Sequence, residues 1–258
     1  MTLSRAWKAA AVLALLAGIA AGAAIGWVNY SKPKLLGLPS PGVHSPAPSP
    51  SPNDPFADTC KPPASAPRAM PSGLPGVWAI QPGSVAGYRA REKFAELPSP
   101  HEAVARTDRV LGWIEISDSS GSIRIESGCV VVDLVSLRSV DVLPGFNTAD
   151  RDESARNFLR TSVHPFAVFR PRPINLPAGL SGGGVVRVGV GGELELNGTT
   201  RSATFSLQVR LRDHAVAAAG QAGVNISDFG IEAPTTVGEF VAVDPHLTLE
   251  ISMTLLRS

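Results

Sequence analysis

Cysteine is nearly absent from this chain of 258 residues, which holds only Cys60 and Cys129. Two cysteines cannot supply the four ligands that a structural zinc ion takes, and they cannot build the disulfide framework of a small secreted domain. In an oxidising compartment a Cys60–Cys129 disulfide could pin the N-terminal part of the chain to the folded part. The alternative is two free thiols, one of them simply buried, and the sequence leaves both open.

A strong net charge is missing as well. Lysine and arginine together number 23 and aspartate and glutamate 22, so the formal net charge at pH 7 is +1. A protein that binds a phosphate backbone concentrates positive charge on one face or along one stretch. The balance in this chain argues against nucleic acid as a partner.

Catalytic signatures are also weak. The sequence has no GxSxG nucleophile elbow, and its glycine-rich stretch 181–192 has no lysine to hold a phosphate. The DFG triplet at 228–230 comes without the HRD motif of protein kinases. His164 could serve as a base for a nearby serine with Asp152 orienting it, but it precedes a proline at a helix-to-strand junction. We therefore predict that the protein is not an enzyme.

One long apolar run lies near the start of the chain. Ala9–Val28 carries no charge over twenty residues, about the length that a helix needs to cross the roughly 30 Å hydrocarbon core of a bilayer. Trp7 precedes the run, and Trp27 and Tyr30 stand at its other margin, as in the aromatic belts of a spanning helix. We expect residues 1–30 to form a transmembrane anchor.

A cleaved signal peptide is the alternative for this run, because small residues such as those at 20–24 suit a signal peptidase. Both alternatives export the rest of the chain. The expected location is the cell membrane, with a single pass and the C-terminal domain on the extracytoplasmic side.

Residues 31–75 are rich in proline, serine and alanine and hold 13 of the 23 prolines of the chain. Proline fixes φ and removes backbone donors, and the tract has few large apolar side chains, so neither a helix nor a sheet ladder is expected. Extended like polyproline, at about 3.1 Å per residue, it would reach on the order of 100 Å. We predict a disordered stalk, with a linker that has no spacing role as the alternative.

Residues 76–258 are predicted to form one β domain, because apolar and polar residues alternate along several of its segments. Every second residue is apolar in SATFSLQVRLR (202–212) and in HLTLEISMTLL (246–256), where Glu250 falls on the polar side. Alternation with period two indicates strands with one packed face and one wet face. The sheet should be antiparallel, as such half-wetted sheets commonly are.

The pair Asn197-Gly198 separates two of these alternating runs. Asn-Gly is the strongest local signal for a hairpin, because both residue types tolerate positive φ. We expect 192–196 and 200–211 to be consecutive, paired strands.

Only Asp150–Arg160 favours a helix. Acidic residues stand at its start and arginines toward its end, which complements the helix dipole. One short helix among about eight strands suggests a closed barrel that the helix caps, since closure removes exposed sheet edges.

Five segments of the domain follow one another in a recognisable order. They are GVWAIQPGS, VVVDLVSLRS, RDESARNFLRTSVHPFAVF, GGELELNGTTRSATFSL and ISDFGI. Together they resemble the YceI-like family of polyisoprenoid-binding β-barrels, with its VDL.SL.S strand, its Arg-Asp helix ending in P..F, its G.L.L.G.T hairpin and its closing DFGI. The resemblance covers nearly all of residues 76–257. It implies an all-β domain, an eight-stranded antiparallel lipocalin-like barrel whose interior holds a long isoprenoid lipid.

An eight-stranded barrel is just wide enough for one slender ligand. The candidate residues of the cavity wall are Phe94, Trp113, Phe158, Phe166, Phe169 and Phe205. Plain core packing is the alternative for each of them. Arg151, Arg160 and His164 are candidates for contact with a lipid head group at the barrel mouth, with capping and surface charge as the alternative. We expect no metal and no cofactor other than a bound polyisoprenoid.

The predicted function is that of a membrane-tethered, extracytoplasmic, non-catalytic protein that binds or carries a long-chain isoprenoid lipid of quinone or polyprenyl type. The alternative is an envelope stress or interaction protein whose barrel is filled by its own side chains and takes no lipid.

Overall fold

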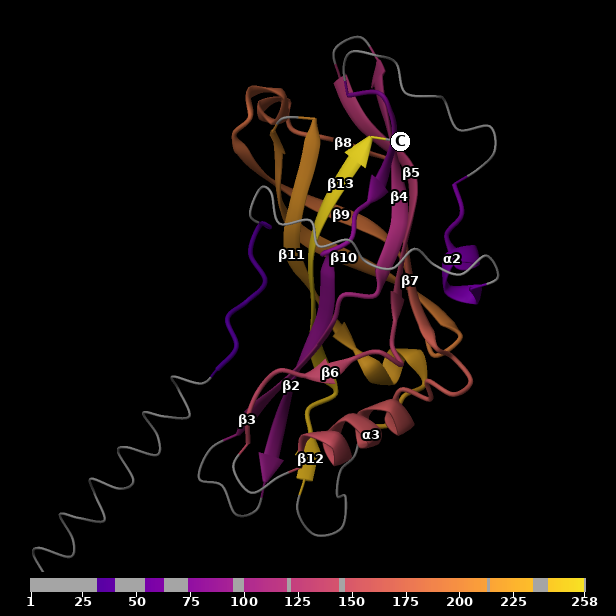
Figure 1. Ribbon diagram of the computed structural model, residues 1–258, viewed down its shortest axis with the longest axis vertical. Coiled ribbons are helices and arrows are strands. Elements are labelled where there is room, and N and C mark those ends of the chain that lie inside the picture. Colours follow the sequence, from indigo (N-terminus) through magenta and orange to yellow (C-terminus); the bar gives the residue numbers. More distant parts are fainter. Residues whose placement is uncertain are drawn as a thin grey trace, which may run out of the picture. The chain divides into compact units, whose positions relative to one another are not determined.

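The computed structural model describes residues 32–39, 54–62, 74–94, 100–119, 122–143, 147–212, 214–233 and 241–257 (Figure 1). The predicted anchor at 1–30 lies outside these residues. Among the residues described, no helix combines the length and the apolar character that crossing a bilayer requires. Residues Leu35–Ser258 form one compact unit, which contains the barrel.

Eight antiparallel strands close into a barrel. The ring closes because β1 pairs with β4 on one side and with β13 on the other. In order around the ring the strands are β1 (Gly76–Ile80), β4 (Val110–Ser119), β5 (Ser122–Asp133), β7 (Phe166–Pro171), β9 (Val185–Leu196), β10 (Thr199–Arg212), β11 (Ala215–Asn225) and β13 (His246–Arg257). This ring confirms the predicted all-β antiparallel barrel.

Further strands extend the sheet beyond the ring. β2 (Val85–Phe94) pairs with β13 beside β1, β3 (His101–Thr107) pairs with β2, and β6 (Arg138–Ser139) pairs with β3. Two short strands, β8 (Ile174–Asn175) and β12 (Val241–Val243), pair with β5 and β2. The 3-10 helices are η1 (Ala178–Gly182) and η2 (Ile226–Phe229).

The β9–β10 hairpin turns at Asn197-Gly198, as the sequence predicts. Leu196 pairs with Thr199, and the turn residues have φ of 51° and 68°. Two successive positive φ angles are the requirement of a type I′ turn, whose twist matches that of the flanking strands. The pairing register of β9 and β10 follows from this turn.

The alternation predicted for β13 holds on the inner face but not on the outer one. Leu247, Ile251 and Leu255 are buried, as expected, but Glu250 is only 1% exposed. The expectation of a wet outer face is therefore wrong at Glu250 and also at Ser252, which is 8% exposed. The carboxylate is covered because the backbone N–H of Leu36 and arginines from β2 and β3 lie against it.

The helix α3 (Thr148–Phe158) confirms the helix predicted at 150–160, with its bounds shifted by two residues. Asn147 caps its start, since the side-chain oxygen accepts the Ala149 N–H at 2.9 Å. Leu159, just after the helix, is buried in an apolar cluster with Leu137 and Leu247. The helix thus packs on the part of the barrel where β13 begins.

The proline-rich tract contains a helix, α2 (Pro55–Thr59), which corrects the expectation that 31–75 has no regular structure. Phe56 is 2% exposed, its ring lies 5.5 Å from that of Phe166, and the Arg109 guanidinium lies 4.8 Å from the Phe56 ring centroid. Cys60 forms a disulfide with Cys129. The disulfide is the correct alternative of the two, and it holds this piece of the tract on the outer face of the barrel.

Candidate functional site

A cavity of ≈ 160 Å³, the volume open to the centre of a water-sized sphere, lies inside the barrel. Its wall reaches from Trp78 and Leu180 in one apolar cluster to Leu137 and Leu159 in the other. The surface that the wall presents to the cavity is apolar. The barrel is therefore hollow, and its own side chains do not fill it from end to end.

The size and chemistry of this cavity favour an apolar occupant. By the same measure one water needs about 10–15 Å³, and it needs two to four polar partners as well. An apolar wall offers water no such partners, whereas an aliphatic chain loses nothing there and gains from leaving water. The cavity is thus suited to a hydrocarbon chain.

Two of the six predicted wall residues line the cavity. Phe169 of β7 and Phe205 of β10 both face it, and their ring centroids lie 5.0 Å apart in an edge-to-face arrangement. Their side chains form one aromatic part of a wall that is otherwise mostly aliphatic.

Phe166 and Trp113 lie elsewhere, on the outer face of the barrel. Successive side chains of a strand point to opposite faces, so Phe166, three residues before the inward Phe169, points outward. In β4, Ile114 lines the cavity, and Trp113 packs in the outer cluster that also contains Phe56. The helix α2 covers both aromatic rings from outside.

Phe94 and Phe158 lie toward the part of the barrel that α3 covers, and neither lines the cavity. Phe94 is buried at the end of β2 with its ring 6.4 Å from that of His101. Phe158, the last residue of α3, is 36% exposed. Lipid contact by any of the six aromatic residues stays a prediction.

The emphasis on phenylalanine missed two aromatic residues of the wall, Trp78 of β1 and Tyr88 of β2. The sequence held a signal for Tyr88, because it stands two residues after Ala86 and two before Ala90 and so shares one strand face with these small apolar residues. Both alanines are buried. Burial raises the pKa of the Tyr88 phenol well above its ordinary value, and the charge of Glu92 raises it further. The hydroxyl therefore stays protonated at physiological pH.

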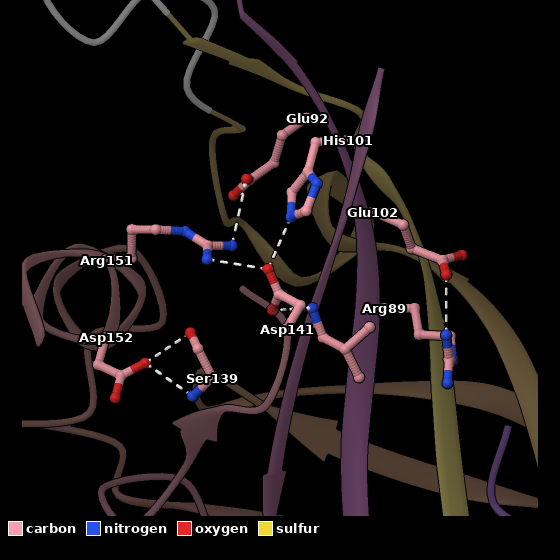
Figure 2. Close-up of polar contacts among 9 residues, drawn as sticks. Arg89, Glu92, His101, Glu102, Ser139, Asp141, Arg151 and Asp152 are labelled. Atoms are coloured by element: carbon pink, nitrogen blue, oxygen red, sulfur yellow. Dashed lines mark hydrogen bonds and ion pairs between the residues drawn. The ribbon is translucent and has the colours of Figure 1, made fainter. Parts of the chain in front are cut away.

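A buried carboxylate, Asp141, joins α3 to β3 (Figure 2). Its Oδ2 lies 2.6 Å from His101 Nε2 and accepts a hydrogen bond from Arg151 Nη1 at 2.9 Å. Its Oδ1 accepts the Val104 N–H at 2.8 Å. Burial works against ionisation of this carboxyl. The bonds from His101 and Val104, with the charge of Arg151, outweigh burial and hold its pKa below the usual range.

Glu92 completes the network on the side of β2. Its Oε2 lies 3.4 Å from Arg151 Nη2. Burial raises the pKa of Glu92, and the favourable charges of Arg151 and His101 compensate for this only in part. Arg151 thus contacts two carboxylates whose pKa values are shifted in opposite directions. The pKa of Asp141 is lowered and that of Glu92 is raised.

The three head-group candidates have different positions, and none of them lines the cavity. Arg151 is bound in the network just described. Arg160 is exposed, with φ of 52°, just after α3. His164 packs over the β9–β10 turn, so close that a Cβ at Gly198 would come within 2.6 Å of its Cε1. Head-group contact by these residues stays a prediction.

Asp152 has a structural partner. Its Oδ1 accepts hydrogen bonds from the Ser139 N–H at 2.8 Å and from the Ser139 hydroxyl at 2.7 Å, which fastens α3 to β6 (Figure 2). Within the described part of the chain, no hydrogen bond joins Asp152 to His164, as an orienting aspartate would need. The same residues include no group of three or more His, Cys, Asp or Glu arranged to hold a metal ion.

The family model of the YceI-like domain matches residues 98–255. The match runs from the start of β3 almost to the end of β13 and includes α3 and most of the cavity wall. No curated protein matches the chain.

Several solved structures resemble this fold. A polyisoprenoid binding domain from Saccharophagus degradans, implicated in plant cell wall breakdown, superposes with a TM-score of 0.52 at 16% identity, over 70% of this chain and 98% of that one. Burkholderia cenocepacia BcnA gives 0.44 at 14% identity, over 65% and 95%. A Campylobacter jejuni YCEI protein gives 0.35 at 12%, over 55% and 79%. The first likeness supports the fold, and the other two superpose too loosely to bear on it.

Proposed function

Because this chain belongs to the YceI-like domain family, we propose that its barrel binds the hydrocarbon chain of a long isoprenoid lipid, of quinone or polyprenyl type, and that it does so without catalysis. The observation that carries this proposal is the apolar cavity of ≈ 160 Å³ inside the barrel. The Saccharophagus degradans domain with the same fold is described as polyisoprenoid binding, which supports the same class of ligand.

Apolar burial is sufficient to hold such a lipid. Each methylene group taken out of water contributes about 0.8 kcal/mol, so several isoprene units provide a favourable free energy without any ion pair. Phe169, Phe205 and the aliphatic wall supply the contact surface.

We also propose that the protein is a single-pass membrane protein with its barrel on the extracytoplasmic side. The apolar run Ala9–Val28 has the length of a spanning helix. The Cys60–Cys129 disulfide supports an oxidising compartment, because disulfides persist outside the cytoplasm and are rare within it.

The test is to identify what the barrel contains. The full chain is purified from the membranes of its own host in a mild detergent, then measured by native mass spectrometry, and the bound lipid is extracted and identified. We expect one isoprenoid lipid per chain, enriched over its share of the host membrane. An apo mass alone, or a lipid mixture with the composition of the bulk membrane, would overturn the proposal.

A further inference from the structure

Most of the exposed large apolar side chains belong to the segments around β6 and α3. Among the described residues, seven large hydrophobic side chains are exposed, and five of them belong to the segments around β6 and α3. These five are Val135, Val140, Val142, Phe158 and Val163. We call them the apolar cap surface. Single exposed apolar residues are ordinary on a protein surface, but a cluster marks an interaction site.

Hydrogen bonds hold these segments together as one structural element. The Leu134 N–H donates to the Pro165 carbonyl at 2.8 Å. Farther along, Ser139 is bound to Asp152, and Asp141 to Arg151 of α3. The segment after β5, the helix α3 and the turn that follows it therefore form a single cap (Figure 1). The five exposed side chains belong to residues of this cap.

The cap at 134–165 carries four arginines and four acidic residues. Arg138 and Arg160 are exposed and Arg156 is half-buried, whereas Asp150 and Glu153 are exposed at the start of α3. The arginines accompany Val135, Phe158 and Val163 in sequence, and the acidic residues lie at the other end of the helix. Apolar side chains next to arginine suit the boundary between lipid head groups and acyl chains.

The segment that begins the barrel unit lies along β13. The Leu36 N–H donates to Glu250 at 3.4 Å, and the Gly37 carbonyl accepts the Ser252 hydroxyl at 2.8 Å. The segment from Leu36 to Gly37 therefore runs along β13 in the direction of that strand. From Gly37 to Leu36 this segment points toward the beginning of β13, where Leu247 belongs to the same apolar cluster as Leu159.

The length of chain between the anchor and this docked segment is short. The predicted anchor ends at Val28, and eight peptide units lead from there to Leu36. At no more than about 3.3–3.6 Å per residue, these units span less than about 30 Å. The tract 31–75 also meets the barrel again at Cys60, so its full length does not serve as a spacer.

We propose that the apolar cap surface rests on the lipid bilayer to which the chain is tethered. The partner that we assign to the cap is a lipid surface. This inference depends on the membrane anchor of the proposed function. It has a consequence for the ligand, because Leu134, Leu137 and Leu159 line the cavity directly beneath the cap. A membrane lipid then has a short route between the bilayer and the barrel interior.

The experiment uses the full chain in vesicles of phosphatidylcholine and phosphatidylglycerol. Single cysteines replace Val142 or Val163, which are 58% and 62% exposed, and Val185, which is 50% exposed at the start of β9 and lies outside the cap, serves as the matched control. Each cysteine carries an environment-sensitive fluorophore, and the two native cysteines do not react because they form a disulfide. Part of the phosphatidylcholine bears a nitroxide on its acyl chain.

We expect the labels at 142 and 163 to shift to shorter emission wavelength on reconstitution and to be quenched by the nitroxide lipid, while the label at 185 changes in neither respect. Replacing Phe158 with Asp should weaken the quenching at 142. The inference would be overturned if all three labels showed the same emission shift and the same quenching. It would also be overturned if the labels at 142 and 163 were protected only in native membranes and only by a protein partner. Bound isoprenoid is measured on the same samples, so a cap that stays in water around a loaded barrel refutes docking alone, and a docked cap on an empty barrel refutes lipid binding alone.

Discussion

Arg106 Nε lies 2.7 Å from Glu250 Oε1, and the arginine side chain reaches this carboxylate by crossing over Gly87. Gly87 is paired with Arg106 on one side and with Glu250 on the other. A Cβ at Gly87 would overlap the Ala105 carbonyl and lie 2.9 Å from Arg106 Cγ. Glycine at this position therefore opens the space through which the ion pair forms.

Replacing Glu250 with Gln should destabilise the protein by about 3–5 kcal/mol, because it leaves two guanidinium groups facing a buried neutral side chain. Glu250 is 1% exposed, and Arg89 Nε lies 3.0 Å from its second carboxylate oxygen. The measurement is the free energy of unfolding from urea denaturation.

The matched control for this variant is Glu193→Gln. Glu193 pairs with Arg172 at 3.7 Å with both side chains more than half exposed, so its loss should change stability by less than about 1 kcal/mol. Equal effects of the two variants would show that the buried pair has no special role.

Reducing the Cys60–Cys129 disulfide should lower the free energy of unfolding by about 2–5 kcal/mol, because the bond closes a long loop in the unfolded chain. It should also release α2, so that a protease cuts near residues 54–62 before it cuts the barrel. Urea denaturation and limited proteolysis, each with and without reductant, measure the two effects. The double variant C60S/C129S should show no further response to reductant, and a response there would mean that the reductant acts elsewhere.

The pH dependence of stability should report on Asp141. Its pKa is lowered in the folded state, so the ionised carboxyl stabilises the fold above the unfolded value of about 3.9, and this contribution disappears as the pH falls toward the folded pKa. The variant Asp141→Asn should therefore be less stable than the parent at neutral pH, by about 3 kcal/mol. The difference in free energy of unfolding between the variant and the parent should become smaller below about pH 4. Urea denaturation at a series of pH values measures it.

Glu92 gives a control of opposite sign. Its pKa is raised by burial, so the ionised group lowers stability above that pKa, and the cost disappears as the pH falls. Replacing Glu92 with Gln should therefore remove no stabilising contribution of the kind that the parent loses in acid through Asp141. If Asp141→Asn and Glu92→Gln followed the same pH course, the assigned directions would be wrong.

The sequence predicts those parts of the fold that depend on local pattern. The alternation in β10 and β13, the positive φ angles at Asn197-Gly198 and the charge order of α3 are all local, and each appears in the structure. The five segments that resemble the YceI-like family add the closure of the ring, which no single segment could supply.

Features that depend on distant contacts are the ones that the sequence does not reveal. Glu250 has the polar position of an outward residue, yet Leu36, more than two hundred residues away, lies over it. Cys60 and Cys129 pair because α2 docks on the barrel, which the composition of the proline-rich tract gives no reason to expect. Phe166 and Phe169 look alike in sequence, and only the register of β7 separates the outer from the inner ring.

Filling the cavity tests lipid binding most directly. Ala218 of β11 lines the cavity and is 3% exposed, whereas its neighbour Ala217 faces the other side of the strand. Ala218→Phe should place a ring where the lipid chain lies, with Val188→Phe on β9 as a second filling variant and Ala217→Phe as the matched control.

The decisive measurement is the isoprenoid content of these variants after purification from host membranes, with circular dichroism confirming that each is folded. Our account predicts that both filling variants lose the bound isoprenoid and that Ala217→Phe retains it. Folded Ala218→Phe and Val188→Phe proteins that retain as much isoprenoid as the parent would contradict the claim that the lipid occupies the barrel.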